Sequence, residues 1–112
     1  MMLTLPANTR INIATTPVDM RKSFDGLAAI ISESLKQDVY SGQLFVFSNR
    51  RGDKLKIFYW DRNGYCYWYK RLERGIFRLP KVKSICYSLS AAELNLLLEG
   101  IDLTDKQRLR AL

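Results

Sequence analysis

The 112-residue sequence contains no histidine. Catalytic arrangements that need an imidazole, such as Ser-His-Asp triads and Cys-His pairs, are thereby excluded, as is every metal site with a histidine ligand. The two cysteines, Cys66 and Cys86, form no CxxC pair, which is typical of ordinary reduced thiols rather than of a disulfide framework. No apolar run approaches the roughly 18 residues that a membrane span needs, and the N-terminus lacks a signal-peptide pattern. We therefore expect a cytoplasmic protein that does not contact a membrane.

The sequence also has little equipment for catalysis. Asp53 and Asp61 fall near opposite ends of one expected strand, roughly 25 Å apart at strand rise, so they cannot share a metal ion. Asp19 and Asp25 point in different directions on an expected helix, and no glycine-rich phosphate loop is present. We expect no catalytic residues, no metal and no cofactor, with an enzyme kept only as a remote alternative.

The positive charge is concentrated in one region. The chain has 18 lysines and arginines against 11 acids, a net charge of +7. Residues 50–83 alone hold eleven basic and three acidic residues, a net charge of +8, so the rest of the chain is nearly neutral. Such a basic region attracts polyanions, although solvated surface charge is the simpler alternative. The cations we assign to DNA binding are Arg50, Arg51, Lys54, Lys56, Arg62, Lys70, Arg71, Arg74 and Arg78.

Length and composition predict a single domain over residues 1–112. Its core is expected to span about residues 10–102, with loose segments at both ends. A short strand is expected at residues 10–14, followed by a helix that begins near Asp19 or Met20. Its apolar stripe consists of Met20, Phe24, Leu27, Ile31 and Leu35. Arg21 and Lys22 could bind phosphate, but near the start of this helix we place them on its solvent face. Ser90 and Glu93 form a capping-box pattern before a short C-terminal helix that ends near Gly100.

Between the two helices the hydrophobic period changes from helical to two. Residues 44–48, 54–61 and 65–72 read as three strands joined by turns, the second at Asn63-Gly64. Residues 76–87 have no clear pattern, and Pro80 argues against a central strand there. The predicted fold class is therefore α+β, an antiparallel meander of three or more strands packed with the N-terminal-half helix and the short C-terminal helix.

The strand register sorts the meander into two faces. A two-residue loop at Asn63-Gly64 pairs Arg62 with Tyr65 and Trp60 with Tyr67, and alternate residues point the same way. One face is then mostly aliphatic, and the other carries aromatic rings among lysines and arginines. The aromatic residues we assign to stacking or docking are Phe58, Trp60, Tyr65, Tyr67 and Tyr69.

The aromatic face has two interpretations. In the first, the C-terminal helix covers it and the tyrosine hydroxyls reach the wet rim, which is the commoner arrangement in layered folds. In the second it is open, and its rings stack on unpaired bases or dock a partner.

Three stretches resemble a known family when they are read in order. They are TTPVDMRKSFDGLAAII, SGQLFVFSNRRGDKLKIFYWDRNGYCYWYKRLERGIFRLP and SAAELNLLLEGID. Together they are similar to the small accessory protein encoded by the second open reading frame of bacterial insertion sequences of the IS66 type, often labelled TnpB. The resemblance implies a role in transposition beside a separate, larger transposase that carries the catalytic acids. It supplies no catalytic residues to carry over.

Two functional hypotheses follow from the residues and the resemblance together. In the first, the basic region binds the DNA of the element, with phosphate contacts supplying most of the affinity. In the second, the aromatic face docks the transposase or another copy of the chain, since Tyr, Trp, Phe and Arg are enriched at interface cores. DNA is the partner we expect first, with the transposase and a homo-oligomer as possible further partners.

Overall fold

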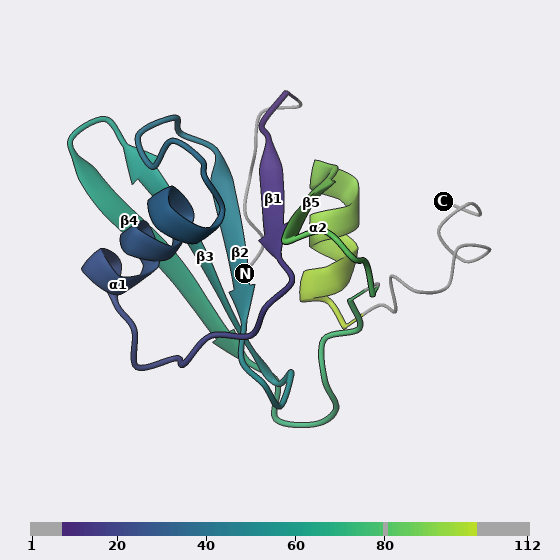
Figure 1. Cartoon of the computed structure of the whole chain (residues 1–112). Coiled ribbons are helices and arrows are strands. Elements are labelled where there is room, and N and C mark those ends of the chain that lie inside the picture. The colour runs from purple at the N-terminus through teal and green to yellow at the C-terminus, as the bar shows by residue number, and fades with distance from the viewer. Residues whose placement is uncertain (1–7, 80, 101–112) are drawn as a thin grey trace.

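The computed structural model describes residues 8–79 and 81–100, which form a five-stranded sheet with helices on both sides (Figure 1). The strand order across the sheet is β4-β3-β2-β1-β5. The strands are β1 (Ile11–Ala14), β2 (Leu44–Ser48), β3 (Lys54–Asp61), β4 (Gly64–Arg71) and β5 (Cys86–Leu89). The helices are α1 (Phe24–Ala29), the π-helical turn η1 (Ile30–Ser34) that continues it, and α2 (Ala91–Leu98). No helix among these residues is long and apolar enough to cross a membrane.

The sheet is mixed, which corrects the expectation of a pure meander. β2, β3 and β4 form the predicted antiparallel meander, but β1 pairs parallel to β2, with Ile11 opposite Leu44. α1 and η1 lie between these two strands in the chain, and a parallel pair needs such a crossover connection. β5 pairs antiparallel with the other edge of β1, where the sequence gave no clear pattern. Pro80 lies outside the described residues.

The register of the second hairpin differs from the predicted one by two residues. Asp61 pairs with Gly64, so the two loop residues are Arg62 and Asn63, and Arg62 takes the left-handed conformation with a φ of 50°. Trp60 therefore faces Tyr65 instead of Tyr67. Because side chains alternate with a period of two, a shift of two residues changes the partners but leaves every side chain on its predicted face.

The first helix begins at Phe24, five residues later than the earliest predicted start at Asp19. Residues 17–22 run as irregular chain across the end of the sheet, where the Val18 N–H donates to the Ser48 carbonyl over 2.8 Å. The helical stripe is confirmed from Leu27 onward, since Leu27 and Ile31 are fully buried. Met20 precedes the helix and does not belong to its stripe.

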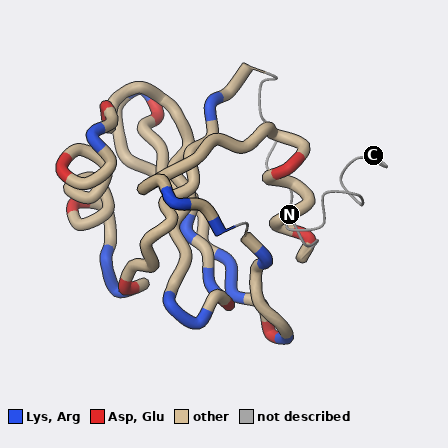
Figure 2. The backbone as a smooth tube through the Cα atoms, turned by 45° about the vertical axis from the view of Figure 1, so that its right-hand side comes forward, with Lys and Arg blue, Asp and Glu red and all other residues tan. Residues whose placement is uncertain are grey.

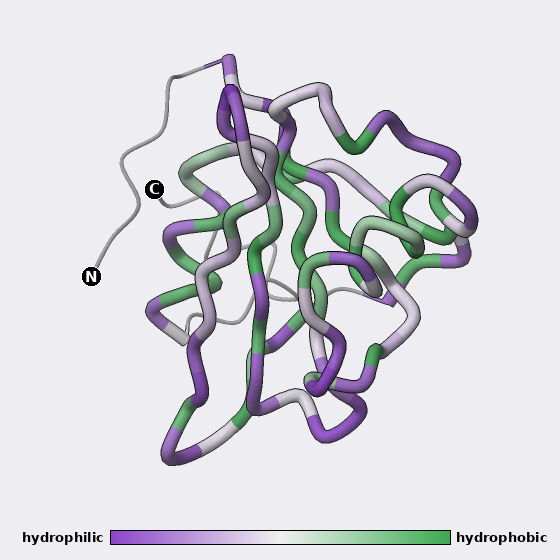
Figure 3. The backbone as a smooth tube through the Cα atoms, turned by 90° about the vertical axis from the view of Figure 1, so that its left-hand side faces the viewer, coloured by the Kyte–Doolittle hydropathy of each residue, from purple (hydrophilic) through white to green (hydrophobic). Residues whose placement is uncertain are grey.

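Each face of the sheet has its own core layer. The aliphatic face, with Val46, Leu55 and Ile57, packs against Leu94 and Leu97 of α2. The aromatic face packs against the first helix. Its buried cluster comprises Ala14, Leu27, Ile31, Leu35, Phe45, Phe47 and Phe58. In Figure 3 hydrophobic residues accordingly occur along both the strands and the helices. The aromatic face is thus covered, but by α1 and η1 instead of the C-terminal helix.

The start of α2 confirms the predicted capping box. The Ser90 hydroxyl accepts from the Glu93 N–H, and the Glu93 carboxylate accepts from the Ser90 N–H, both over 3.1 Å. Gly100 follows the helix with a φ of 84°, which only glycine adopts freely, and its N–H donates to the Leu97 carbonyl. Residues 101–112 lie outside the described residues.

Substitution of Phe58 tests whether the aromatic face forms a second core layer. Phe58 is fully buried between α1 and the sheet, so we expect Phe58→Ala to lower the free energy of unfolding by about 3–5 kcal/mol through lost burial and a residual cavity. Tyr40→Ala is the matched control, because Tyr40 is 60% exposed. Urea denaturation of both variants measures the difference. An unchanged unfolding midpoint for Phe58→Ala would show that this face is open.

Candidate functional site

The β2–β3 turn is organised by one asparagine. The Asn49 side-chain oxygen accepts from the N–H groups of Gly52 and Lys54, both over 3.0 Å, and its amide donates to the Asp53 carboxylate over 2.7 Å. An asparagine side chain that hydrogen-bonds nearby backbone groups in this way stabilises the turn locally. Arg50 and Arg51 occupy the outside of this turn and are exposed.

The chain that follows β4 folds back against the same turn. The Leu72 N–H donates to the Asp53 carbonyl and the Phe77 N–H to the Gly52 carbonyl, both over 2.8 Å. Gly52 has a φ of 85°, which favours glycine, and Ile76 lies beside it, 3.4 Å from where a β-carbon would be. The contact brings a second group of exposed cations, Arg74 and Arg78, to the same end of the sheet.

Residues 17–22 reach this end from the other side and are held by a buried lysine. Lys56 is only 3% exposed, and its ammonium donates to the carbonyls of Met20 and Lys22 over 2.8 and 2.7 Å. The ammonium also lies 4.6 Å from the ring centre of Tyr67 and 5.0 Å from that of Tyr69. The backbone on both sides of Arg21 is thereby fixed to β3.

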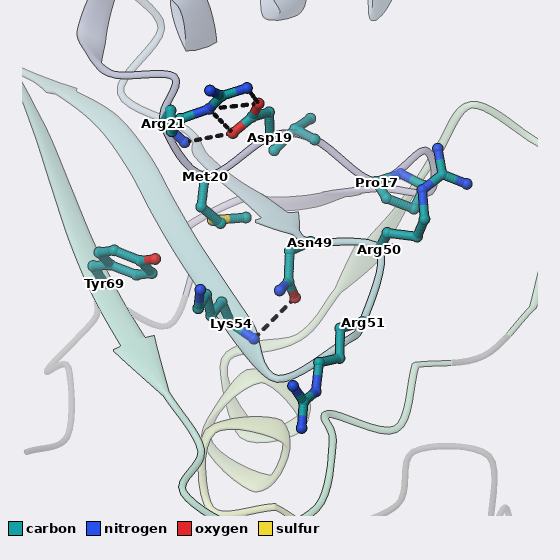
Figure 4. A pocket seen from close by; sticks show the side chains of 10 residues that line it. Pro17, Asp19, Met20, Arg21, Asn49, Arg50, Arg51, Lys54 and Tyr69 are labelled. Carbon is teal, nitrogen blue, oxygen red and sulfur yellow. Dashed lines mark hydrogen bonds and ion pairs between the residues drawn. The ribbon is translucent and has the colours of Figure 1, made fainter.

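These segments enclose an open pocket of about 550 Å³ (Figure 4). It is lined by Pro17, Val18, Asp19, Met20, Arg21, Asn49, Arg50, Arg51, Lys54 and Tyr69. The Tyr69 ring stands at one end and Arg50 at the other, with Met20 and Lys54 between them. The volume falls within the range of ordinary small-ligand sites, roughly 300–1,000 Å³.

The pocket carries an excess of positive charge. Arg21 donates to both carboxylate oxygens of Asp19, the shortest contact being 2.6 Å, which pairs these two charges. Arg51 lies 3.9 Å from the Asp53 carboxylate. Within residues 8–79 and 81–100, neither Arg50 nor Lys54 has a carboxylate at ion-pair distance. Two cations are therefore left to attract an anion.

Hydrogen bonds also set the acidity of the two carboxyl groups near the pocket. The side-chain hydrogen bond from Arg21 lowers the pKa of Asp19 to about 2, with a further contribution from the Arg21 N–H. The amide of Asn49 lowers the pKa of Asp53 below its ordinary value. Both groups carry a negative charge near neutral pH and serve as acceptors within their own loops.

The pocket belongs to a larger surface that we call the basic end. It is the end of the sheet at the β2–β3 turn, with the cations Arg21, Arg50, Arg51, Lys54, Arg71, Arg74 and Arg78. Figure 2 shows basic segments gathered at this lower end of the molecule. Arg71 pairs with Lys54 across the strands, and its guanidinium donates to Glu73 over 2.7 Å. Six of the nine cations predicted from the sequence are brought together here.

The other three predicted cations lie elsewhere. Arg62 occupies the β3–β4 turn, at the opposite end of an eight-residue strand. Lys56 is buried and its ammonium is engaged by two carbonyls, so it is not a surface cation. Lys70 donates to the Leu98 carbonyl over 2.7 Å, which ties β4 to the last turn of α2.

The predicted aromatic residues are also divided. Phe58 is core, and Tyr67 packs against the same layer, with its ring 4.9 Å from that of Phe24. Trp60 and Tyr65 form a cluster with Tyr40 near the β3–β4 turn, at centroid distances of 5.0 and 6.1 Å. Of the predicted five, Tyr69 alone combines substantial exposure, 46%, with a place in the basic pocket.

The acids of the described residues do not converge on a metal-binding arrangement. No group of three or more Cys, Asp and Glu side chains that could hold an ion occurs in residues 8–79 and 81–100. Asp53 and Asp61 lie at opposite ends of β3, as the strand spacing predicts.

Fold and surface together define a small α+β protein that presents clustered cations at one end of a mixed sheet. The family model for IS66 Orf2-like proteins matches residues 9–108. The chain therefore belongs to the IS66 Orf2-like family, which associates it with transposition in an accessory role. The family is not one of known enzymes.

Two relatives from Sinorhizobium fredii (strain NBRC 101917 / NGR234) support this assignment. The "uncharacterized protein y4jC" is 41% identical over 99 residues, which cover 88% of this chain and 85% of the relative. The "uncharacterized protein y4hO" is 43% identical over 101 residues, which cover 90% and 88%. No solved structure matches the chain.

Sequence patterns alone did not identify six of the ten residues that line the pocket, and Arg21 and Asn49 are two of them. Arg21 was placed on the solvent face of a helix, but residues 17–22 precede the helix and cross the sheet end. The parallel β1–β2 pairing that carries them there leaves no local signal. Asn49 could have been found, because an asparagine at the start of an Asn-Arg-Arg-Gly stretch is a common turn former.

The Arg21–Asp19 pair can be tested by titration. We expect the Asp19 carboxyl to titrate at a pH of about 2, and Arg21→Ala to return its pKa toward the ordinary value of about 3.9. A carboxyl whose folded pKa is lowered stabilises the protein above its unfolded pKa, and that contribution is lost as the pH falls toward 2. Carboxyl NMR chemical shifts measure the titration. An identical Asp19 pKa in both proteins would contradict the pairing.

Lys56 can be tested by a change that keeps its volume. Lys56→Met leaves the Met20 and Lys22 carbonyls without their buried donor, and we expect a loss of about 1–3 kcal/mol in unfolding free energy. Lys54→Met, two residues away on the same strand face, is the control and should change stability by less than about 0.5 kcal/mol. Equal midpoints in urea for the two variants would show that the Lys56 contacts do not stabilise the fold.

Proposed function

We propose that this protein binds DNA through the basic end as an accessory factor in transposition of its element. One observation carries the proposal, namely that three separate chain segments bring their cations to one end of the sheet. They are residues 17–22, the β2–β3 turn and the segment after β4. Because hydrogen bonds fix the β2–β3 turn and the segments beside it, the arginines project from a rigid support.

The residue types support a phosphate-binding surface. Six of the seven basic-end cations, all except Lys54, are arginines, and the planar guanidinium matches phosphate oxygens with two parallel hydrogen bonds. Such contacts fix the position of a protein on DNA without reading its sequence. The basic end is therefore suited to holding DNA, while recognition of a particular element is left to sequence-reading contacts or to another protein.

The docking alternative is supported by fewer exposed aromatic residues than the sequence predicted. α1 and η1 cover most of the aromatic face, so that face does not present an open sheet of rings. What supports docking is the exposure of Phe24 and Tyr40, at 41% and 60%. These rings lie beside Tyr67 and Trp60 respectively, and a partner such as the transposase would contact them away from the basic end.

Salt dependence of binding tests the DNA proposal. We expect a labelled duplex to bind weakly and with little sequence preference, and the logarithm of its affinity to fall linearly with the logarithm of salt concentration. The triple variant Arg50→Gln, Arg51→Gln, Arg74→Gln should flatten that slope by about 0.9 for each phosphate contact it removes, and should weaken binding at low salt by about tenfold or more. Fluorescence anisotropy at several salt concentrations measures both quantities.

A charge-matched control lies at the other end of the sheet. Arg10, Lys36 and Arg62 are exposed there. The Arg10 carbonyl accepts from the first residue of β2, Arg62 lies in the β3–β4 turn, and Gln37, next to Lys36, lines a pocket with Arg10. Replacing these three by Gln removes the same charge and should leave the slope nearly unchanged. An equal loss in both triple variants would mean that net charge alone drives binding. Folded wild-type protein that binds no duplex at the lowest salt would refute the proposal.

A further inference from the structure

The pocket of the basic end has features that phosphate binding does not explain. Its lining includes the apolar side chains of Pro17, Val18 and Met20 together with the ring of Tyr69. A site that only held backbone phosphates would need cations and N–H groups, not apolar walls or an exposed ring. The combination of cations with an aromatic surface is typical of sites for unpaired nucleotides.

The Tyr69 ring is held in place from behind. The Lys56 ammonium lies 5.0 Å from the ring centre, and that ammonium is itself fixed by two backbone carbonyls. Yet 46% of Tyr69 is exposed, so the ring is oriented by the core while a large part of it stays accessible. A ring positioned in advance loses little conformational freedom when a base stacks on it.

Lys54 flanks the ring on its own sheet face. Tyr69 pairs with Lys56, and the next pair on that face is Lys54 with Arg71, so Lys54 is a diagonal neighbour of Tyr69 at a separation of roughly 7–8 Å. Arg50 stands at the far end of the pocket (Figure 4). The carboxylate of Asp19, which would repel a phosphate, accepts hydrogen bonds from Arg21.

Resting on the DNA binding proposed above, we propose that this pocket holds an unpaired nucleotide of a DNA strand. Its base stacks on the exposed face of Tyr69, and the adjoining phosphates contact Lys54 and Arg50. A base within an intact duplex is stacked on its neighbours and cannot reach the ring. The basic end should consequently prefer single-stranded DNA, or a duplex with an unpaired segment, over fully paired DNA.

Substitution of Tyr69 separates stacking from charge. We expect Tyr69→Ser to weaken binding of a fluorescein-labelled oligo(dT) by about tenfold, and to weaken binding of a blunt duplex by less than twofold. Tyr69→Phe keeps the ring and should bind both probes like the wild type. Tyr40→Ser removes an exposed ring outside the pocket and should leave both affinities unchanged. Equal losses on strand and duplex, or an unchanged strand affinity in Tyr69→Ser, would overturn the inference.

Photocross-linking tests the same contact in the unaltered protein. An oligo(dT) with one internal 5-iodo-deoxyuridine should cross-link to Tyr69, as located by mass spectrometry of the digested adduct. An adduct confined to Tyr40 or Trp60 would place the strand at the other aromatic cluster and overturn the assignment. Thymidine monophosphate should compete at least a hundredfold more weakly than the oligonucleotide. Equal competition would mean that the pocket takes a free nucleotide instead of a strand.

The outcomes for the two proposals are distinguishable. If neither strand nor duplex binds at low salt, both the DNA proposal and this inference fail. If the duplex binds through the basic-end arginines but Tyr69 has no effect on strand binding, the DNA proposal stands and only the stacking inference fails.

Discussion

The buried ammonium of Lys56 is the contact on which the arrangement of the basic end depends. A buried charge is costly unless it is fully hydrogen-bonded, and here two backbone carbonyls and two aromatic rings surround it. Those carbonyls belong to Met20 and Lys22, so one side chain of β3 fixes irregular chain that has no helical or sheet hydrogen bonds of its own. Arg21 lies between the two anchored carbonyls. The position of Arg21 and the orientation of Tyr69 therefore share one cause.

The parallel pairing of β1 with β2 determines which helix covers which face. A crossover between parallel neighbours carries the intervening helix over one side of the sheet, and here it lies on the face of Phe45 and Phe58. α2 follows β5 and covers the opposite face. The aromatic face is therefore a second core layer along most of its length. Among the described residues, the exposed aromatic side chains near this face are Phe24, Tyr40 and Tyr69.

Local patterns explain why much of the architecture was predictable. The alternation of residues 44–72 defined the three antiparallel strands. Because side chains alternate with a period of two, the error of two residues in the predicted register left every side chain on its correct face. The Ser90–Glu93 capping box is likewise a local signal and was confirmed. β5 and the parallel pairing were missed because they depend on contacts between distant residues, such as Ile11 with Leu89.

The candidate site likewise contains residues that local patterns predict and residues that are placed by contacts distant in the sequence. Arg50 and Arg51 were predicted from a glycine turn between strands, which places its residues at the surface, and both are exposed. Lys56 was misplaced because a lysine at an alternating position reads as a surface cation, and its burial depends on carbonyls 34 and 36 residues away. Arg21 was misplaced for the complementary reason, since apolar spacing through Met20 indicated a helix where tertiary contacts hold irregular chain.

The acids of the basic end explain how a positive surface stays ordered. Seven cations at one end of a small sheet repel one another, and such repulsion disfavours the compact state. Asp19 and Glu73 each accept from an arginine two residues away, and Asp53 accepts from the turn asparagine. These local contacts stabilise the loops while Arg50 and Lys54 stay free of carboxylates among the described residues. The two pocket cations without a carboxylate partner among the described residues therefore line the same pocket as Tyr69, which is 46% exposed.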